Sequence, residues 1–196
     1  IAYVPFITPE SSAHIRANLE LPEHDRYIGI NPCGASERRR LTPPMVATIT
    51  HMILAAHPES RVLLLVARNE QEYLDAVLKQ LSEEEQKLVG SRIQLLPEQC
   101  SVIDYCTYID NLRGLITIDT AAVHLACASD VPQLSFYNDD PINYGRWAPV
   151  YSCDDPIGCS QSKRFVGCLD MRQAPQDELY RLSHEFVTKL MAYIAG

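Results

Sequence analysis

A run of three arginines follows a turn of small residues near the start of the chain. Residues 31–40 read Asn-Pro-Cys-Gly-Ala-Ser-Glu-Arg-Arg-Arg. Gly34 and Ala35 leave the backbone approachable, Ser36 offers a hydroxyl, and a guanidinium such as that of Arg39 is a fork-shaped donor suited to phosphate oxygens. The pattern indicates an anion-binding cradle, although a polar turn with a solvated basic tip fits the same residues. Neither a Walker loop nor a GxGxxG motif is present.

A second candidate anion site lies at the start of a helical pattern. Asp119 and Thr120 precede Ala121 and continue to His124. The first N–H groups of a helix have no partner within it, and with the helix dipole they favour a bound anion. Thr120 and His124 are four residues apart and share a helix face. By itself His124, between apolar neighbours, fits a buried core histidine equally well.

Two further turns offer polar groups. Glu70 follows an apolar run and could cap the next helix or accept hydrogen bonds from ribose hydroxyls. The segment 97–101, with Cys100 and Ser101 at its end, could line a nucleobase pocket or simply fill a loop. Ser101 also fits the N-cap of the helix that follows.

Strand and helix patterns alternate along the chain and must position these turns. Apolar runs of strand length lie at 27–31, 61–67, 92–97, 114–118 and 131–137, and helical patterns lie at 44–56, 70–81, 101–111, 120–128 and 177–195. Strands without polar alternation are buried on both faces, and crossovers of this length join parallel neighbours. We predict an α/β fold: a Rossmann-like open parallel sheet of five strands with helices on both faces. Ligands of such sheets bind beyond the carboxyl ends of the strands, where the four turns would meet.

The expected domain begins at residue 27. Residues 1–26 contain three prolines and little periodicity, which predicts a linker or the tail of a missing N-terminal domain. Residues 27–196 are expected to form one domain, with an irregular segment at 138–171. The chain starts at Ile1, without an initiator Met, as a processed or excised piece would.

Composition excludes several classes of protein. The chain has 196 residues, 46% apolar and 21% charged, which excludes disordered and fibrous classes. With 17 basic and 25 acidic side chains the net charge is -8, which disfavours a nucleic-acid partner. No apolar run approaches the ~20 residues that cross a bilayer, and no signal-peptide pattern opens the chain.

The cysteines indicate a reducing compartment. Their number, seven, is odd, and four of them are scattered in apolar stretches. Cys153, Cys159 and Cys168 lack the close pairs of a structural zinc site, so we expect free or loosely paired thiols and no metal.

The four turns, in this order, resemble the C-terminal donor-binding domain of glycosyltransferase family 9, the ADP-heptose:lipopolysaccharide heptosyltransferases. Residues 118–132 read Ile-Asp-Thr-Ala-Ala-Val-His-Leu-Ala-Cys-Ala-Ser-Asp-Val-Pro. This string is similar to the family signature Asp-Thr-Gly-x-x-His-Leu-Ala-x-Ala-x-x-x-Pro. Residues 34–36 and 39–41 resemble its Gly-Ala-Ser and Lys-Arg-Trp elements, and the likeness spans most of residues 27–190. The fold it implies is the C-terminal lobe of a GT-B glycosyltransferase.

The resemblance implies a role for each matching residue. Ser36 and Arg39 would contact the diphosphate, and Glu70 would contact the ribose. Cys100 and Ser101 would lie beside the adenine. The residues that would hold the diphosphate and the sugar are Asp119, Thr120, the backbone of Ala121, and His124. The sequence departs from the family where Ala121 replaces Gly, Arg39 replaces Lys, Leu41 replaces Trp, and Tyr137 stands where Gly is common. Ala121 still permits an N–H contact, and Arg39 keeps the positive charge.

The activity implied is transfer of heptose from ADP-heptose to the lipopolysaccharide inner core with inversion, without a metal or other cofactor. In the family, the acceptor groove and general base belong to an N-terminal domain, so this polypeptide alone is predicted inactive, and ~150 further residues are expected upstream. A cytoplasmic location is expected, with peripheral contact at the inner face of the bacterial inner membrane as an option. Two alternatives stay open: a GT-B transferase using another nucleotide-sugar, and a non-catalytic nucleotide-binding module.

Overall fold

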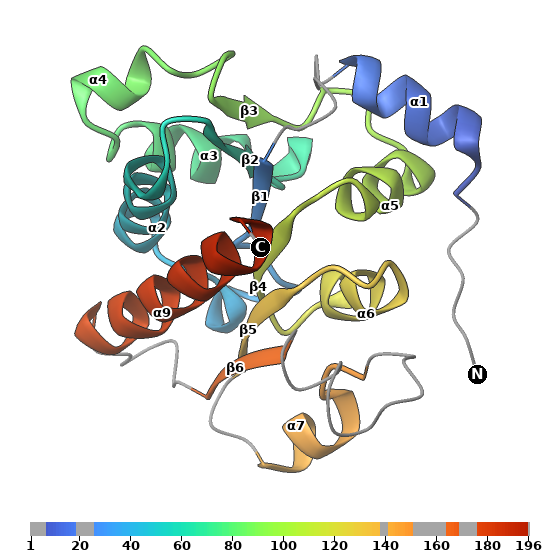
Figure 1. Cartoon of the computed structure of the whole chain (residues 1–196). Coiled ribbons are helices and arrows are strands. Elements are labelled where there is room, and N and C mark those ends of the chain that lie inside the picture. The colour runs from blue at the N-terminus through green and yellow to red at the C-terminus, as the bar shows by residue number, and fades with distance from the viewer. Residues whose placement is uncertain (1–6, 19–25, 138–140, 151–163, 169–175, 196) are drawn as a thin grey trace.

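A six-stranded parallel sheet forms the centre of the molecule (Figure 1). The computed structural model describes residues 7–18, 26–137, 141–150, 164–168 and 176–195. The strands are β1 (Arg26–Asn31), β2 (Ser60–Leu64), β3 (Ile93–Leu95), β4 (Gly114–Ile118), β5 (Gln133–Tyr137) and β6 (Arg164–Cys168). Their spatial order is β3-β2-β1-β4-β5-β6, and every neighbouring pair is parallel. The predicted Rossmann-like α/β class is confirmed.

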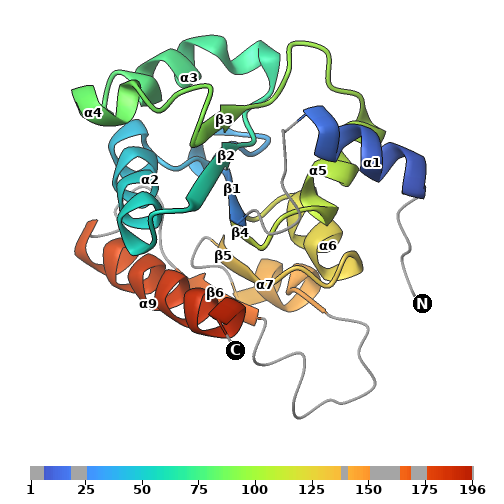
Figure 2. The same cartoon turned by 45° about the horizontal axis from the view of Figure 1, so that its top comes forward.

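Helices cover both faces of this sheet (Figure 2). One side carries α2 (Pro43–Ala56), α3 (Gln71–Leu78) and α9 (Gln176–Ala195), and the other carries α1 (Pro9–Asn18), α5 (Val102–Asp110) and α6 (Ala121–Ala128). The remaining described elements are α4 (Glu83–Gln86), α7 (Pro141–Trp147), and the 3₁₀ turns η1 (Glu37–Arg39) and η2 (Arg68–Glu70). Pro43 opens α2 without loss, because the first N–H groups of a helix have no partner within it.

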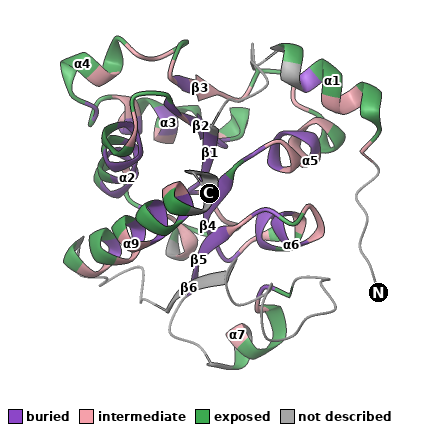
Figure 3. Cartoon of the chain, in the orientation of Figure 1, coloured by how far each residue is buried: buried purple, intermediate pink, exposed green. Residues whose placement is uncertain are grey.

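The central strands β1, β2, β4 and β5 are buried (Figure 3), and their side chains divide between two cores. Ile28 and Ile30 point to the core under α2, α3 and α9, whereas Tyr27 belongs to the core under α1, α5 and α6. In β2 and the residues after it, Leu64 and Leu65 divide between the cores in the same way. Both faces of β1 and β2 are therefore largely apolar, which explains why the sequence shows apolar runs there.

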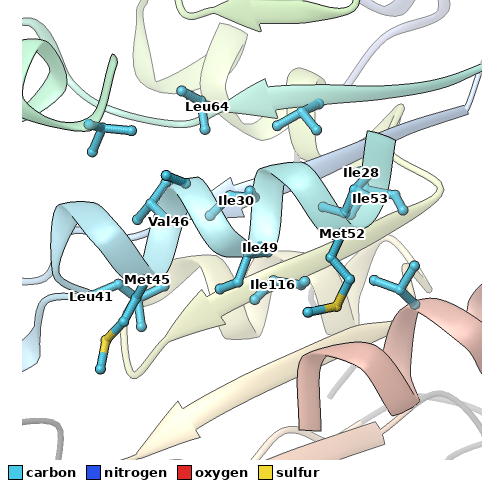
Figure 4. Packing of buried hydrophobic residues seen from close by; sticks show 14 of the residues in the cluster. Ile28, Ile30, Leu41, Met45, Val46, Ile49, Met52, Ile53, Leu64 and Ile116 are labelled. Atoms are coloured by element: carbon cyan, nitrogen blue, oxygen red, sulfur yellow. The ribbon is translucent and has the colours of Figure 1, made fainter. Parts of the chain in front are cut away.

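Helix α2 packs on the first core (Figure 4). Its buried side chains recur at helical spacing, and among them Val46, Ile49 and Ile53 have no measurable exposure. They lie over Ile30 and Ile116 from β1 and β4. Burial of this apolar stripe, rather than intrinsic helix propensity, holds α2 on the sheet.

Two elements differ from the sequence prediction. Five strands were predicted, and the structure adds β6, which pairs only with β5 at the edge of the sheet. The segment 1–26 was predicted to be a linker or the tail of a preceding domain, and within it Pro9–Asn18 form α1, which packs on α5. Ile15 of α1 is buried, and Ser12 donates a hydrogen bond to Asn111 at 3.2 Å. Residues 9–18 thus belong to the body of the domain, and a preceding domain stays a prediction.

The carboxyl ends of β1 and β4 mark the point where the strand order reverses. From β1 the chain passes outward to β2 and β3, and then crosses to β4 on the other side of β1. Loops after adjacent strands that lead in opposite directions leave a crevice between them, and ligands of open α/β sheets bind there. None of the described helices is both long and apolar enough to span a bilayer.

Candidate functional site

The loop after β1 folds back on itself and returns its arginines to the sheet edge. Leu41 N donates to Pro32 O at 3.0 Å, and Arg39 N donates to Ser36 O at 2.8 Å. Gly34 is required by close packing, because a Cβ there would lie 2.7 Å from Arg39 O and 2.9 Å from Ile118 Cδ1. The loop therefore has no room for a larger residue at position 34.

Arg39 joins the two predicted anion-binding turns. Its Nη1 lies 3.4 Å from Asp119 Oδ2, directly after β4. The Arg39 side chain is 43% exposed, whereas that of Asp119 is 11% exposed. The guanidinium is thus placed over the end of β4 and still open to a ligand.

Helix α6 presents its N-terminus to the same crevice. Thr120 is its N-cap, with extended backbone angles (φ -149°, ψ 177°), and its Oγ1 accepts a hydrogen bond from Ala122 N at 3.3 Å. Among the described residues none accepts a hydrogen bond from the N–H of Ala121, and that residue is exposed. A donor of this kind beside the positive end of the helix dipole suits an anion.

His124 lies one turn further along α6 and is exposed, so it is not a buried core histidine. Its ring meets the ring of Trp147 edge to face, with centroids 6.0 Å apart. Tyr137 at the end of β5 fixes this neighbour by donating its hydroxyl to Trp147 O at 2.7 Å. Thr120, Ala121 and His124 accordingly flank one end of the crevice.

A pocket of about 380 Å³ lies beyond the ends of β1, β2 and β3. Its lining residues are Asn31, Cys33, Leu65, Ala67, Arg68, Leu96, Pro97, Glu98, Cys100, Ser101, Val102 and Tyr105. Cys100 and Ser101 are in the wall, so the structure brings them together with the end of β1. Much of the wall is apolar, which suits a flat uncharged ring.

The Ser101 side chain is exposed, but hydrogen bonds hold it in place. Its hydroxyl accepts a hydrogen bond from Asp104 N at 3.1 Å, while the Asp104 carboxylate accepts one from Ser101 N at 2.9 Å. This capping box starts α5 and holds the pocket wall in place.

Glu70 is separated from the pocket in this arrangement. Its Oε1 accepts a hydrogen bond from Arg40 Nη2 at 2.6 Å, and Glu70 is not part of the pocket wall. That hydrogen bond raises the pKa of Arg40. The guanidinium also lies 5.8 Å from the centre of the Tyr73 ring, whose hydroxyl donates to Leu41 O at 2.7 Å. The predicted ribose contact of Glu70 stays a prediction.

The thiols of the pocket are neutral at physiological pH. Burial raises the pKa of Cys33 to about 11, against a smaller opposite effect of Arg40. Burial and then Asp104 raise the pKa of Cys100 to about 11. Burial also raises the pKa of the Tyr105 hydroxyl. These groups can line a pocket for an uncharged ring but are poor nucleophiles.

Sequence reasoning missed Asn31 and Tyr105 as parts of the site. Asn31 donates hydrogen bonds to Thr117 Oγ1 at 2.9 Å and Thr120 Oγ1 at 2.8 Å, and it also lines the pocket. A polar residue ending an otherwise apolar strand was the signal for Asn31. Tyr105 follows Ser101 by one helical turn, a spacing that looks like ordinary core packing.

Two of the late cysteines, Cys153 and Cys159, lie outside the described residues, and Cys168 is described only as part of the β6 backbone. Within the described ranges, no group of three His, Cys, Asp or Glu side chains could hold a metal ion.

Comparison with known proteins finds similarity at the level of structure. No family model and no curated protein sequence matches the chain. The structure of Escherichia coli ADP-heptose lipopolysaccharide heptosyltransferase II superposes with a TM-score of 0.69 and 14% identity over 93% of this chain and 52% of that one. E. coli heptosyltransferase WaaC with ADP superposes with a TM-score of 0.58 and 17% identity, over 93% of this chain and 48% of that one. A family 9 glycosyltransferase from Veillonella parvula superposes with a TM-score of 0.62 and 16% identity, over 96% of this chain and 52% of that one.

These similarities establish the fold. The chain has a heptosyltransferase-like, Rossmann-like fold of the GT-B type, as the sequence resemblance implied. It spans about half the length of these structures.

Proposed function

We propose that this chain is the donor-binding half of an inverting glycosyltransferase that transfers heptose from ADP-heptose to the lipopolysaccharide inner core. The observation that carries the proposal is the position of Asn31 between a pocket and a helix N-terminus. Asn31 lines a largely apolar pocket of about 380 Å³, and it donates a hydrogen bond to Thr120, the N-cap of α6. Arg39 lies at Asp119, directly before that N-cap. A nucleoside diphosphate has the same order of an uncharged ring and then negative charge.

The geometry supports a specific placement of the donor. The nucleobase would occupy the pocket beside Cys100 and Ser101. The diphosphate would lie between Arg39 and the exposed N–H of Ala121, with the Ser36 hydroxyl as a further donor. Bound there, phosphate oxygens would compete with Asp119 for the Arg39 guanidinium, which is open to solvent on its other side.

The proposed reaction is displacement at the anomeric carbon of the sugar. An acceptor hydroxyl attacks this carbon, its proton passes to a general base, and the bond from the carbon to the diphosphate oxygen breaks. Negative charge grows on the departing diphosphate, and Arg39 and the helix N–H groups are preorganised to stabilise it. The base and the acceptor groove would come from an N-terminal domain, so we expect this chain alone to bind the donor without transferring the sugar.

A transferase that uses another nucleotide-sugar is the second candidate. It is favoured by the apolar walls of the pocket, since side chains such as Leu65, Leu96 and Val102 stack on any base. The cradle for the diphosphate would be the same.

Calorimetric titration of the chain tests the proposal. We expect binding of ADP and ADP-heptose, with affinity reduced about tenfold or more in Arg39→Ala and His124→Ala, because each removes a group placed at the diphosphate or sugar. Arg181→Ala is the matched control, since Arg181 is exposed on α9 and pairs with Glu178. Absence of binding by any nucleoside diphosphate, or equal affinities in all variants, would overturn the proposal. UDP and GDP titrations, and transfer assays on any longer protein containing this chain, decide between the two donors.

A further inference from the structure

Asn31 has a hydrogen-bonding atom that the fold itself does not use. It is the last residue of β1 and is only 5% exposed. Its amide nitrogen donates to Thr117 Oγ1 at 2.9 Å and to Thr120 Oγ1 at 2.8 Å. Both hydrogens of the nitrogen are therefore committed, one to each threonine.

The surrounding hydroxyls fix which way this amide is turned. Thr117 donates its own hydroxyl to Ile118 O at 2.9 Å, so its oxygen must accept from Asn31. Thr120 likewise donates its hydroxyl to Ile118 O at 3.3 Å, so its oxygen also accepts from Asn31. With both hydroxyl hydrogens directed to Ile118 O, the amide nitrogen faces the two threonines.

The amide oxygen is left toward the pocket. Asn31 lines the pocket, whose other walls come from the loops after β2 and β3 and from the start of α5, away from the threonines. In the part of the chain that the structure describes, no group donates a hydrogen bond to Asn31 Oδ1. Asn31 Oδ1 is not one of the fully buried side-chain atoms without a partner among the described residues, which is consistent with an oxygen that is reached from the pocket. An acceptor open to a ligand-sized pocket is available to a ligand O–H or N–H.

We propose that Asn31 Oδ1 accepts a hydrogen bond from a ribose hydroxyl of the bound nucleotide. This inference rests on the proposed function and names a contact within it. Asn31 lies between the apolar pocket and the Thr120 cap, and in a nucleoside diphosphate the ribose lies between base and phosphates. Glu70, the acceptor expected from sequence, is held by Arg40 and is not part of the pocket wall.

The assignment gives Asn31 a second role as a positioning residue. The same amide that would meet the ribose also holds the Thr120 hydroxyl that caps α6. Ribose and diphosphate would thus be bound by groups in direct contact, and the position of one would set the position of the other.

Titration with a ligand series tests the proposal. ADP, 2′-deoxy-ADP and 3′-deoxy-ADP are each titrated into the wild type, Asn31→Ala and Thr117→Val. We expect the wild type to bind one deoxy ligand about tenfold more weakly than ADP, the counterpart of one uncharged hydrogen bond. Asn31→Ala should bind ADP about tenfold more weakly and lose the preference. Thr117→Val removes the partner on the side away from the pocket, so it should keep the preference.

Asn31→Asp supplies a second variant if Asn31→Ala does not fold. It keeps an acceptor of the same shape and should retain the preference for ADP over the deoxy ligand. Equal binding of all three ligands by the wild type, or an unchanged preference in Asn31→Ala, would overturn the contact while leaving nucleotide binding intact. IDP, which lacks the amino group of the base, is a further ligand. If the wild type binds IDP more weakly than ADP but binds both deoxy ligands as tightly as ADP, Asn31 Oδ1 contacts the base, and the ribose contact is overturned. No binding of ADP at all would instead overturn the proposed function.

Discussion

Arg39 Nη1 lies 3.4 Å from Asp119 Oδ2, across 80 residues of sequence. The contact brings a cation from the loop after β1 to the first residue after β4, where the strand order reverses. Because Arg39 is 43% exposed, the pair adds little to stability, and its value lies in placing the guanidinium. A phosphate arriving in the crevice would find the cation already in position.

Arg39→Lys and Arg39→Gln separate the charge of this residue from its shape. We expect Arg39→Lys to bind ADP within about threefold of the wild type and Arg39→Gln to lose about tenfold or more, because the diphosphate needs a cation there more than a fork. Both should unfold within about 1 kcal/mol of the wild type, as an exposed ion pair allows. Calorimetry and urea denaturation measure the two quantities. Equal ADP affinity in Lys and Gln variants would show that the charge does not reach the ligand.

Gly34→Ala should distort the cradle. A Cβ at this position would lie 2.7 Å from Arg39 O, which requires the loop to move. We expect weaker ADP binding and lower stability, by about 1 to 3 kcal/mol as in other overpacked sites. Gly145→Ala is the control, since nothing lies within 4 Å of a Cβ there and α7 gains a better helix former. Unchanged ADP binding in Gly34→Ala would show that the loop can accommodate a Cβ at this position without displacing the cradle.

The sequence predicted helix starts and buried strands, because both depend on residues that are close together in the chain. Thr120 was recognised as part of an anion site because a helix start is visible in local sequence, and in the structure Thr120 is the N-cap of α6. Ser101 was recognised in the same way. The apolar runs predicted β1, β2, β4 and β5 for a similar reason: burial on both faces requires it.

Contacts between distant segments were beyond such patterns. Nothing near Glu70 in sequence reveals that Arg40 will hold its carboxylate. The amide of Asn31 reaches Thr117 only because β1 and β4 are neighbours in the sheet. Helix α1 was missed because its apolar contact rests largely on Ile15, which leaves no visible periodicity. Strand β6 was missed because it lies at the edge of the sheet, pairs only with β5, and falls in the segment 138–171 that was predicted to be irregular.

Ser101→Ala and Ser82→Ala compare two capping boxes, only one of which lies in the pocket wall. Ser82 accepts from Glu85 N at 3.3 Å, and Ser101 accepts from Asp104 N at 3.1 Å. Each substitution should lower the free energy of unfolding by about 1 kcal/mol. Only Ser101→Ala should also weaken ADP binding, because α5 carries the wall residues Val102 and Tyr105. Equal ADP affinity in the two variants would show that α5 does not contact the ligand.

The pocket thiols should react slowly with alkylating reagents, and with a steep dependence on pH. With a pKa of about 11, Cys33 and Cys100 are about 0.1% thiolate at pH 8, so their alkylation rates should rise about tenfold per pH unit up to that pKa. Mass spectrometry of each modified cysteine measures the rates. ADP should protect both, and not Cys106, which is absent from the pocket wall. Protection of all three cysteines, or of none, would contradict this placement.

The same thiols give the folded state a defined response to alkali. Their folded pKa lies above the ordinary 9.0, so unfolding releases protons at high pH. Stability is therefore retained below about pH 9 and declines as the pH rises toward 11. Substituting both cysteines with serine should flatten this part of the stability profile. An unchanged slope would assign the alkaline loss to other groups.

Ile15→Ala tests whether α1 is part of the domain. Ile15 is 2% exposed and lies in the core with Tyr108 and Leu112, so its truncation should lower the free energy of unfolding by about 2 kcal/mol or more. Ala13→Ser on the exposed side of the same helix is the control and should cost about 0.5 kcal/mol or less. Urea denaturation measures both. A linker that merely touches α5 would give two equal, small effects, whereas a helix that completes the second core gives a difference of at least threefold between them.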